Sequence, residues 1–547
     1  MNSWQFRQAG AVACSLCRLL GLVIVLLLPS VYARADEPTI RTGVSGKEIA
    51  EYLESLSRNG GIVTDLAVQL ENGRTVYEVT SVKNQDSRPW VILVNISELE
   101  FRKNAQQYAD DGFAMPIHRE ITVDRKKFHS AVWVQDPSAE PSLFLPAEKL
   151  PESGSIGSDL DPLRDVMTKL ITENNIPGGT LAVAHKGKMI FERGFGYSDI
   201  ETKTGMPAAA NMRIASLSKP ITAVAILILV QEGKLDLDGK LIDLLASHPK
   251  HRFETKQTMV VDPRWSNITV RNLLQHSGGW DRDKSKDTVF QLAEITKALE
   301  LKRLARTPDM IRYQFRQPLD FDPGSQYAYS NIGYCMLGRV IESASGQTYD
   351  DFVRDRILKP AGMTQTRLGK TRLTDRAIDE VHYYTQKIRK GPAIWNVAEG
   401  KSNGKQKMVP SPYGQWDLEV MDAHGGWTST APDLVRFIDA IDEVKSPLLN
   451  SESIQFMLAL PSFADSSTTN LWYGLGWNVR VVDSSGGKNF WHTGSLAGTS
   501  TLMVRRWDGY SWAVLFNVDQ TKGGERCTDI IDREIHQAVN KLPIEKR

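Results

Sequence analysis

The stretch that decides the fold is RIASLSKPITAVAILIL, residues 213–229, in which polar residues stand just before a long apolar run. The apolar run is too long for a typical strand and stops near Gly233, so it predicts a buried helix. If this helix begins at Ser216, that serine and Lys219 lie three positions apart on one helical face. Ser216 is then either an N-cap or a nucleophile that Lys219 keeps reactive.

A helix N-terminus suits a reactive serine because its free backbone N–H groups and its dipole favour negative charge. Both would stabilise an alkoxide at Ser216 and, later in the reaction, an oxyanion. The S-x-x-K pattern is weak by itself, because about two chance matches are expected in a chain of this length. Two further segments of the chain therefore have to support the chemical interpretation.

The second segment is FDPGSQYAYSNIGYCMLGRVI, residues 321–341, in which Tyr329 and Asn331 follow a Pro-Gly turn and precede a helix-like run. A lysine ammonium favours the phenolate of a tyrosine beside it, so Tyr329 could accept the proton of the serine. Asn331 offers an amide that could orient the lysine or bind a substrate carbonyl. Taken alone, Tyr329 could equally be a buried tyrosine whose hydroxyl is satisfied.

The third segment is FWHTGSLAGTS, residues 490–500, which we expect to lie on a strand. Its candidate substrate-binding residues are His492, Thr493, Gly494 and Ser495. Gly494 has no side chain, so a substrate backbone can approach it closely. The backbone N–H groups of Ser495 and of the serine nucleophile would then form a two-donor oxyanion hole. Taken alone, His492 could also be a structural histidine.

The motifs SLSK, YSN and HTG, in this order, resemble those of the serine β-lactamase and penicillin-binding protein family. The resemblance covers most of residues 160–540 and extends to LLQHSGGW (273–280), the run 329–363, GGWTSTAPDLVRF (425–437) and YGLGW (473–477). A tyrosine in the second motif is similar to the class C and esterase branch, where it serves acylation and deacylation. The resemblance implies that Ser216, Lys219 and Tyr329 are catalytic. It also implies an α+β fold, with an antiparallel sheet flanked by helices plus a helical lobe.

His492 departs from the lysine that is common in true β-lactamases and holds a substrate carboxylate. An imidazole is largely neutral near pH 7, which favours an esterase, amidase or peptidase of the family. We therefore expect a serine hydrolase that forms a Ser216 acyl-enzyme with amide or ester substrates, small molecules or peptides, with cell-wall peptides among the candidates. The alternatives are a class C-like β-lactamase, a D-Ala carboxypeptidase and a catalytically idle binding protein.

The domain that carries these motifs, residues 159–547, also reads as α+β from its patterning. DPLRDVMTKLITENNI (161–176) has helical spacing, and GTLAVAHKGKMIFERGFGY (179–197) predicts two strands joined at Lys186-Gly187. The end of the chain predicts further strands and a closing amphipathic helix. Strands at both ends with helices between them favour an antiparallel sheet in which the first and last strands pair.

The start of the chain has the features of an export signal. Residues 1–35 predict a cleaved signal peptide, because arginines precede the apolar run LLGLVIVLLL and Ala33-Arg34-Ala35 follows it. An uncleaved anchor is the alternative. We therefore expect a secreted or periplasmic protein, with no later segment apolar enough to span a membrane. Residues 136–158, rich in Pro, Ser and Gly, predict a linker.

Residues 36–135 contain a weak internal repeat, in which Gly61 and Gly112 are separated by the same interval as Tyr77 and Phe128. Each glycine closes a helix-like stretch and precedes alternating residues, so two helix-plus-hairpin repeats are expected, forming a small α+β module. This region faintly resembles the repeats that precede the catalytic domain of polyglycine hydrolases, which are secreted endopeptidases. Patterning gives the repeats no catalytic or metal-ligand cluster.

Composition excludes several classes of function. The net charge of +1 gives no reason to expect a nucleic-acid partner. The chain has no metal-ligand spacing and no Gly-rich phosphate loop after a strand, so neither a metal nor a cofactor is expected. Cys335 and Cys527 remain after signal removal, and export permits a disulfide between them without establishing it. The G-x-S-x-G match at 400–404 lies in a polar loop, which argues against a nucleophile elbow.

Overall fold

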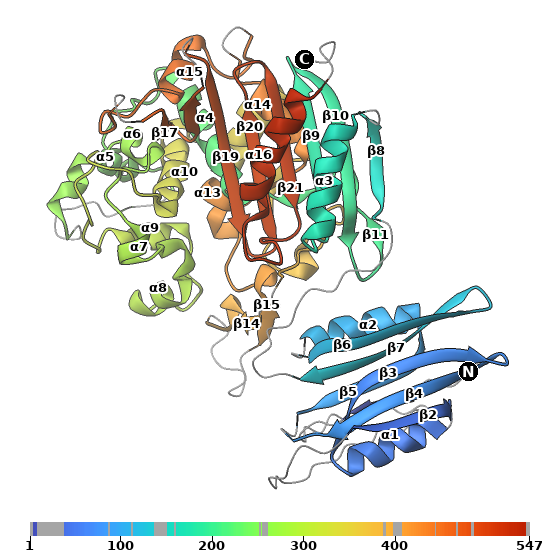
Figure 1. Cartoon of the computed structure of the whole chain (residues 1–547). Helices are drawn as coiled ribbons and strands as arrows, with labels where there is room; N and C mark the ends of the chain where they lie inside the picture. The colour runs from blue at the N-terminus through green and yellow to red at the C-terminus, as the bar shows by residue number, and fades with distance from the viewer. Residues whose placement is uncertain are drawn as a thin grey trace. The chain divides into compact units, whose positions relative to one another are not determined.

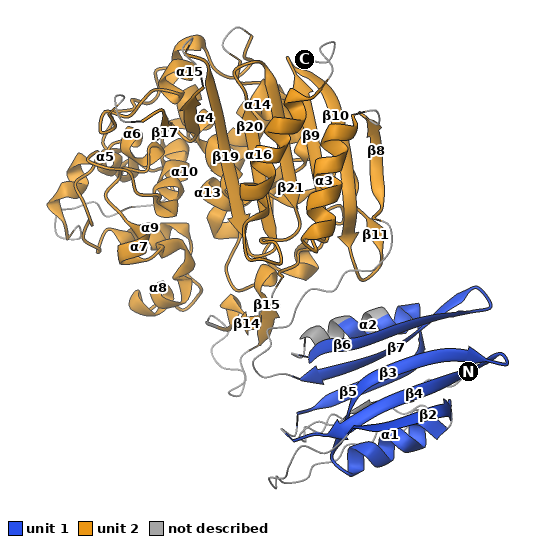
Figure 2. Ribbon diagram, viewed as in Figure 1, with its two compact units in different colours: residues 1–144 blue, residues 145–547 orange. Residues whose placement is uncertain are grey.

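The structure, a computed structural model, divides the chain into two compact units, Met1–Phe144 and Leu145–Arg547 (Figure 2). The described residues are 4–7, 38–46, 48–85, 88–110, 113–135, 150–157, 160–250, 253, 261–386, 390–397, 407–442, 445–465, 469–482 and 486–542. The G-x-S-x-G match at 400–404 lies outside them. Among these residues no helix combines the length and hydrophobicity needed to cross a bilayer.

The first unit contains two copies of one strand–helix–strand–strand arrangement (Figure 1). The first copy is β2 (Thr39–Ser45), α1 (Glu48–Arg58), β3 (Gly61–Glu71) and β4 (Arg74–Lys83). The second copy is β5 (Trp90–Ser97), α2 (Glu98–Asp110), β6 (Phe113–Val123) and β7 (Lys126–Gln135). Both copies have the same strand order, β2-β4-β3 and β5-β7-β6. The helix-plus-hairpin pattern had omitted the strand before each helix, because a continuous apolar run such as WVILVNIS has no strand periodicity.

The strand pairing aligns the two copies with a shift of one residue from the alignment that the interval between the glycines predicted. Tyr77 of β4 and His129 of β7 occupy the same place, because each lies opposite equivalent residues of its two neighbouring strands. The interval between the glycines had aligned Tyr77 with Phe128 instead. A shift of one residue moves a side chain to the other face of a sheet, so the face on which His129 lies becomes clear only from the ladder.

Two of the regions predicted to lack fixed structure contribute strands. Most of the expected signal peptide lies outside the described residues, but Trp4–Arg7 forms β1, which pairs antiparallel with β5. Cleavage of the signal peptide stays a prediction. The expected linker, 136–158, includes β8 (Glu152–Ile156), which pairs with β10 (Lys188–Asp199) of the second unit. The small residues that suggested a flexible linker are therefore in part an edge strand of the large sheet.

The second unit is built around a nine-stranded sheet of described residues (Figure 1). Its main path runs β11-β10-β9-β21-β20-β19-β18-β17. Those strands are β9 (Gly178–His185), β10 (Lys188–Asp199), β11 (Thr204–Gly205), β17 (Leu471–Tyr473), β18 (Asn478–Val481), β19 (Lys488–Leu496), β20 (Thr499–Arg505) and β21 (Tyr510–Phe516). The antiparallel pairing of β9 with β21 confirms that strands from the two ends of the domain meet.

Helices cover both faces of this sheet, and the side chains of its central strands alternate between two cores. On one face α3 (Asp161–Glu173) and α16 (Cys527–Asn540) pack on Leu181 and Val514. On the other face α4 (Ser218–Gln231) and its neighbours pack on Ala182 and Ala513. This period of two is what a sheet with both faces buried requires. The cysteines are free and buried, Cys335 in the second core and Cys527 in the first, so they form no disulfide.

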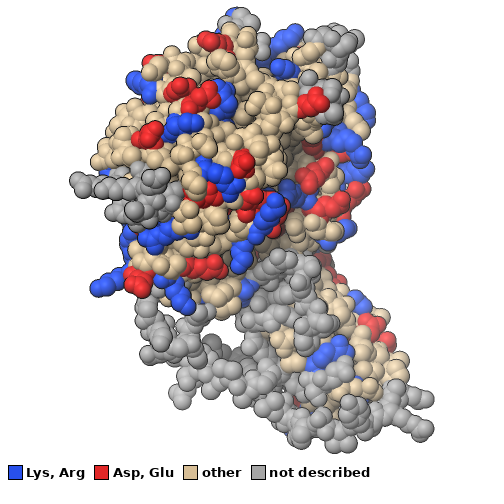
Figure 3. All heavy atoms as spheres, turned by 90° about the vertical axis from the view of Figure 1, so that its left-hand side faces the viewer, with Lys and Arg blue, Asp and Glu red and all other residues tan. Residues whose placement is uncertain are grey.

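A helical lobe completes the unit beyond β17. Its described helices include α5 (Leu241–Ala246), α6 (Val270–Leu274), α7 (Arg282–Ser285), α8 (Leu292–Ala298), α9 (Thr307–Gln314) and α10 (Asn331–Ser345). Helix α4 lies between lobe and sheet and is buried on all sides from Ser218 to Leu229. On the lobe face of the molecule, acidic and basic side chains are interspersed rather than gathered by sign (Figure 3). The fold class inferred from the motifs, an α+β domain with an antiparallel sheet and a helical lobe, is confirmed.

Candidate active site

Ser216 lies on a tight turn rather than on the long helix. Residues Ala215–Leu217 form a 3-10 turn, η1, that follows β12 (Met212–Arg213), and α4 begins only at Ser218. The predicted helix start at Ser216 is therefore two residues early. Ala215 has a φ of 47°, a left-handed conformation that costs an L-residue about 1 kcal/mol. Ser216 is half-buried in a run of fully buried neighbours, so the turn presents its hydroxyl to the pocket.

The amine of Lys219 has three acceptors and a strongly shifted pKa. Its Nζ donates to Ser216 Oγ at 3.0 Å, to Asn331 Oδ1 at 2.7 Å and to the carbonyl of His424 at 3.0 Å. Burial lowers the pKa of Lys219 to about 7, although the carboxylate of Asp287 opposes the shift. Lys219 is therefore divided between its ammonium and its neutral amine near neutral pH.

The same contacts define what the neutral amine would do. An uncharged lysine has two N–H donors and one lone pair, and two of its three partners, a carbonyl and an amide oxygen, can only accept. The lone pair of the neutral amine is then directed at Ser216, whose hydroxyl can donate. Loss of one proton from Lys219 thus places a lone pair 3.0 Å from Ser216 Oγ, in position to accept the hydroxyl proton.

Asn331 is fixed in the orientation that Lys219 needs. It is the first residue of α10, whose N-cap is Ser330. Its side-chain Nδ2 donates to Asp287 Oδ2 at 2.5 Å, which turns its Oδ1 toward Lys219. Sequence reasoning missed Asp287, which is half-buried and whose pKa burial raises. No motif marks it, because Asp287 meets Asn331 only through the fold of the lobe.

Tyr329 meets Ser216, as the motifs predicted, but not as a phenolate. Burial raises the pKa of the Tyr329 phenol well above its usual value, and a hydrogen bond with Ser216 only partly offsets this. The cations of Lys219 and Arg282 lie 4.7 and 4.8 Å from the ring centroid. The expectation that Lys219 would favour a phenolate is therefore wrong, because desolvation outweighs the nearby charge. Tyr329 is a protonated hydroxyl that can donate.

His276, from the stretch LLQHSGGW, holds Tyr329 from both sides. The N–H of Ala328 donates to the carbonyl of His276 at 2.8 Å, and the N–H of Ser330 donates to its Nδ1 at 3.1 Å. The two rings lie 4.2 Å apart between centroids. Burial lowers the pKa of His276 well below its usual value, so the ring is neutral and accepts. The stretch belongs to the family resemblance, but nothing in its sequence indicates this positioning task.

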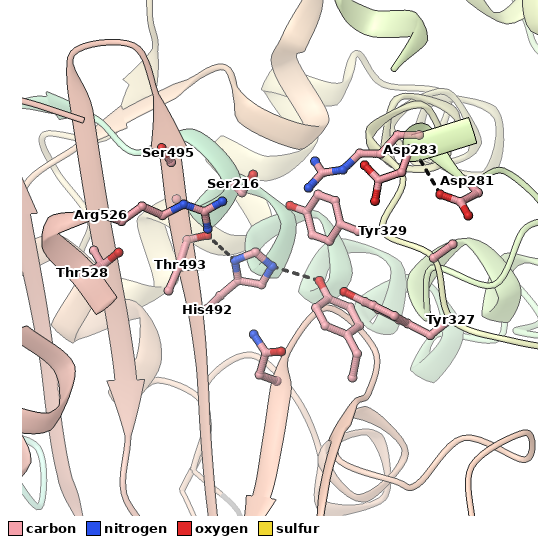
Figure 4. Close-up of a pocket in the computed structure, with 15 residues that line it drawn as sticks. Ser216, Asp281, Asp283, Tyr327, Tyr329, His492, Thr493, Ser495, Arg526 and Thr528 are labelled. Carbon is pink, nitrogen blue, oxygen red and sulfur yellow. Dashed lines mark hydrogen bonds between the residues drawn. The ribbon is translucent and has the colours of Figure 1, made fainter. Parts of the chain in front are cut away.

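Strand β19 forms the opposite wall and lies against the turn that carries Ser216. A Cβ added to Gly494 would lie 2.3 Å from the carbonyl oxygen of Ile214 and 3.1 Å from the backbone nitrogen of Ser216. Only a glycine allows this approach. The predicted residues Thr493, Gly494 and Ser495 all line the pocket with Ser216. Figure 4 shows Thr493 and Ser495 on the strand beside Ser216. The two backbone N–H groups expected to form an oxyanion hole thus come from neighbouring segments.

His492 is neutral and faces Tyr473. Its Nδ1 donates to the carbonyl of Thr493 at 2.7 Å, and its Nε2 accepts from the hydroxyl of Tyr473 at 3.0 Å. Burial, together with the charge of Lys219, lowers the pKa of His492 to about 3. The imidazole therefore brings no positive charge to the pocket, in line with the expectation that it would not replace a lysine ammonium.

The pocket has a volume of about 530 Å³ and takes residues from both the sheet and the lobe (Figure 4). Sequence reasoning missed several lining residues: Asp281, Arg282, Asp283, Tyr327, Tyr473, Asn478, Arg526 and Thr528. Figure 4 shows the side chain of Arg526 reaching toward Thr493, on the same wall as Ser495. The positive charge at this wall therefore comes from the residue before α16, far from the HTG motif in sequence.

Comparison with protein families and curated proteins agrees with this geometry. The family described as Beta-lactamase matches residues 163–535. Penicillin-binding protein 4* of Bacillus subtilis is 26% identical over 60% of this chain and 65% of its own length. Serine beta-lactamase-like protein LACTB, mitochondrial, of Bos taurus is 26% identical over 53% of this chain and 58% of its own. The chain thus spans about three fifths of the length of these relatives.

Solved structures with the same fold include proteins of several activities. The octameric penicillin-binding protein homologue of Pyrococcus abyssi superposes with a TM-score of 0.52 at 22% identity, over 71% of this chain and 79% of its own. The D-stereospecific amidohydrolase of Streptomyces sp. gives 0.51 at 23% identity, over 70% and 98%. The D-amino acid amidase of Ochrobactrum anthropi SV3 gives 0.51 at 22%, over 70% and 98%. At these identities the likeness establishes the fold.

Proposed function

This chain belongs to the Beta-lactamase family, and from that premise we propose that it is an exported serine hydrolase that acts through a Ser216 acyl-enzyme on amide or ester substrates. One observation carries the proposal. The Nζ of Lys219 lies 3.0 Å from Ser216 Oγ in a site that lowers the lysine pKa to about 7. A serine and a base poised near neutral pH, side by side in a pocket, are what nucleophilic catalysis requires.

Acylation begins with the neutral amine of Lys219. It accepts the hydroxyl proton as Ser216 Oγ attacks the substrate carbonyl carbon, and a C–O bond forms. The carbonyl oxygen becomes an oxyanion, which the backbone N–H groups of Ser216 and Ser495 stabilise. Tyr329, still protonated, gives its proton to the leaving amine or alkoxide and regains one from the Lys219 ammonium. The leaving group departs and the acyl group stays on Ser216.

Deacylation reverses these proton transfers with water as the nucleophile. Lys219, neutral again, takes a proton from the attacking water, and a second oxyanion forms in the same place. Ser216 Oγ then leaves with the proton of Tyr329, which regains one from the Lys219 ammonium. Asn331 and His276 do not react in this scheme. They hold Lys219 and Tyr329 in position, through the contacts at 2.7 Å and 3.1 Å.

The charge pattern of the pocket bears on the substrate. His492 is neutral, so a substrate carboxylate would meet Arg526 rather than the HTG motif. Names among the similar proteins include a D-amino acid amidase and a hydrolase with promiscuous acyltransferase activity, which supports amides and esters as the substrate class. A peptide, including one derived from the cell wall, belongs to this class. Without a cation at residue 492, we give β-lactams second place.

A covalent probe and a substrate panel test this proposal. A fluorophosphonate should label Ser216, and mass spectrometry should find the adduct there and lose it in Ser216→Ala. Ser495→Ala is the matched control, because it removes a hydroxyl from the same pocket but keeps the backbone N–H. Turnover of a p-nitrophenyl ester, a D-amino acid amide, a glycine-rich peptide and nitrocefin then ranks the substrates. A folded wild-type protein that neither labels nor turns over any of them would instead be an idle binding protein.

Export rests on the predicted signal peptide and needs its own measurement. Residues 1–35 should be absent from the protein recovered outside the cytoplasm, with a mature N-terminus at Asp36. N-terminal sequencing of the mature chain checks this. Recovery of the full-length chain from the membrane fraction would favour an uncleaved anchor.

A further inference from the structure

The second copy of the N-terminal repeat carries four titratable side chains together. His118 and Glu120 are two positions apart on β6 and share one face of the strand. His129 of β7 lies directly opposite Glu120 in the ladder. Glu98, the first residue of α2, reaches the same imidazole. No sequence motif marks this group, because its members come from a helix and two strands.

The first copy of the repeat shows that the fold does not require these residues. In the matching ladder Tyr77 occupies the place of His129, and Val68 lies opposite it where Glu120 lies opposite His129. Leu66 takes the place of His118, because Leu66 lies two residues before Val68 on its strand and His118 lies two residues before Glu120. Leu66 and Tyr77 are buried in an apolar core. One copy thus closes this face with apolar side chains, while the other fills it with imidazoles and carboxylates.

The hydrogen bonds around His129 assign a separate task to each of its ring nitrogens. Nε2 lies 2.5 Å from Glu98 Oε2, so this nitrogen carries the proton and donates to the carboxylate. Nδ1 is then an acceptor, and it faces His118 Nε2 at 3.0 Å and Glu120 Oε2 at 3.9 Å. The other oxygen of Glu120 pairs with Lys127 at 3.0 Å. A carboxylate behind a histidine is the usual partner of a metal-binding imidazole.

The two imidazoles are held in place by packing. Phe101 of α2 stacks on His118 at 4.4 Å and on His129 at 4.6 Å between ring centroids. The side chain of His129 is only 3% exposed, while that of Glu120 is 38% exposed. The two imidazole donors are therefore fixed by packing, while the carboxylate of Glu120 is in contact with solvent.

We propose that His118 Nε2, His129 Nδ1 and the Glu120 carboxylate bind a divalent transition-metal ion such as Zn²⁺, with Glu98 orienting His129. Donor atoms of one tetrahedral Zn²⁺ ion stand about 3.4 Å apart, and the present separations of 3.0 and 3.9 Å lie on either side of that value. Imidazole and carboxylate donors suit zinc, and water would complete the coordination. His118 would bind through Nε2 as its other neutral tautomer, because the proton that Nε2 now donates to His129 would be carried by Nδ1 instead.

The experiment compares the full chain with variants copied from its own first repeat. His118→Leu with Glu120→Val reproduces Leu66 and Val68, so the double variant should fold. Calorimetric titration with Zn²⁺ should give one more bound equivalent for the wild type than for this variant. Co²⁺ should give the wild type a visible absorption of a tetrahedral nitrogen–oxygen site that the double variant lacks. Glu98→Gln should weaken Zn²⁺ binding about tenfold, as loss of an outer partner does.

A second group of possible ligands, Asp199, Glu201 and His382, provides the control. His382→Gln removes its imidazole and should leave the equivalent assigned to the first group unchanged. Equal Zn²⁺ stoichiometry in the wild type and the double variant would overturn the proposal, as would a bound equivalent that is lost in His382→Gln. If circular dichroism shows that the double variant is unfolded, the single change Glu120→Gln decides: unchanged affinity for Zn²⁺ overturns the proposal, and loss of at least tenfold supports it.

Discussion

Lys219 Nζ lies 3.0 Å from Ser216 Oγ, and the lysine pKa of about 7 makes this contact depend on pH. As an ammonium, Lys219 donates to the serine and blocks its deprotonation. As a neutral amine, it accepts the serine proton. The direction of this one hydrogen bond therefore separates the resting form of the site from the reactive one.

The pH dependence of acylation should report Lys219. Because the reactive form is the deprotonated one, kcat/KM for an ester should rise with pH through about 7 and then level off. The measurement is kcat/KM for a p-nitrophenyl ester between about pH 5 and pH 9. If Tyr329 acted as a phenolate base instead, the rise would continue to the end of this range, because burial raises the tyrosine pKa.

Tyr329→Phe should lower kcat by at least about a hundredfold, because the leaving group loses its proton donor. Burial of the ring among His276 and the cations should be kept, so the thermal midpoint should change little. Tyr327→Phe is the matched control, since Tyr327 lines the same pocket and no hydrogen bond to Ser216 is recorded for it among the described residues. Equal turnover in wild type and Tyr329→Phe would refute the assigned proton path.

Asp287→Asn should change kcat and its pH profile more than KM. The carboxylate of Asp287 accepts from Asn331 and raises the pKa of Lys219 against the effect of burial. Removing its charge should lower the lysine pKa further, so the rising limb of kcat/KM should move to lower pH. The amide of the introduced asparagine can also turn an N–H toward Asn331. That would loosen the contact between Asn331 and Lys219, so kcat should fall. An unmoved pH limb would show that Asp287 is only structural.

Arg526→Ala should discriminate between substrates by charge. The side chain of Arg526 lies on the pocket wall with Thr493, while His492 is neutral, so this guanidinium is the cation of that wall that a substrate carboxylate can meet. We expect KM to rise about tenfold or more for a carboxylated substrate and to change little for a neutral ester. Arg533→Ala, which changes an exposed arginine on the helix that follows Arg526, is the control. Equal losses for both substrates would mean that Arg526 supports the wall rather than recognising charge.

The motifs predicted the residues that meet at Ser216 because each motif is continuous in sequence. SLSK fixes the spacing of Ser216 and Lys219, and YSN brings Tyr329 and Asn331 together on one turn. The charge state of Tyr329 could not be predicted, because it depends on burial by segments that the motif does not contain. For the same reason Asp287, which orients Asn331 through the lobe, carries no local signal.

The fold, too, has features that local sequence predicts and features that depend on contacts between distant segments. The pairing of β9 with β21 follows from strands at both ends of the domain, and the alternation of their side chains was visible in the sequence. The alignment of the two N-terminal repeats was not, because a shift of one residue leaves the pattern of residue types similar but moves each side chain to the other face of the sheet. The place of His129 beside Glu120 is therefore visible only in the ladder.

The close approach at Gly494 means that the sheet cannot deform without disturbing the nucleophile. The strand at this point is separated from the turn that bears Ser216 by less than the width of a methyl group. Loosening of that edge of the sheet, by heat or by a bulkier residue, would be transmitted at once as a shift of the reactive oxygen. On heating, catalytic activity should therefore be lost at a lower temperature than the one at which the whole domain unfolds, so activity reports on the order of this strand.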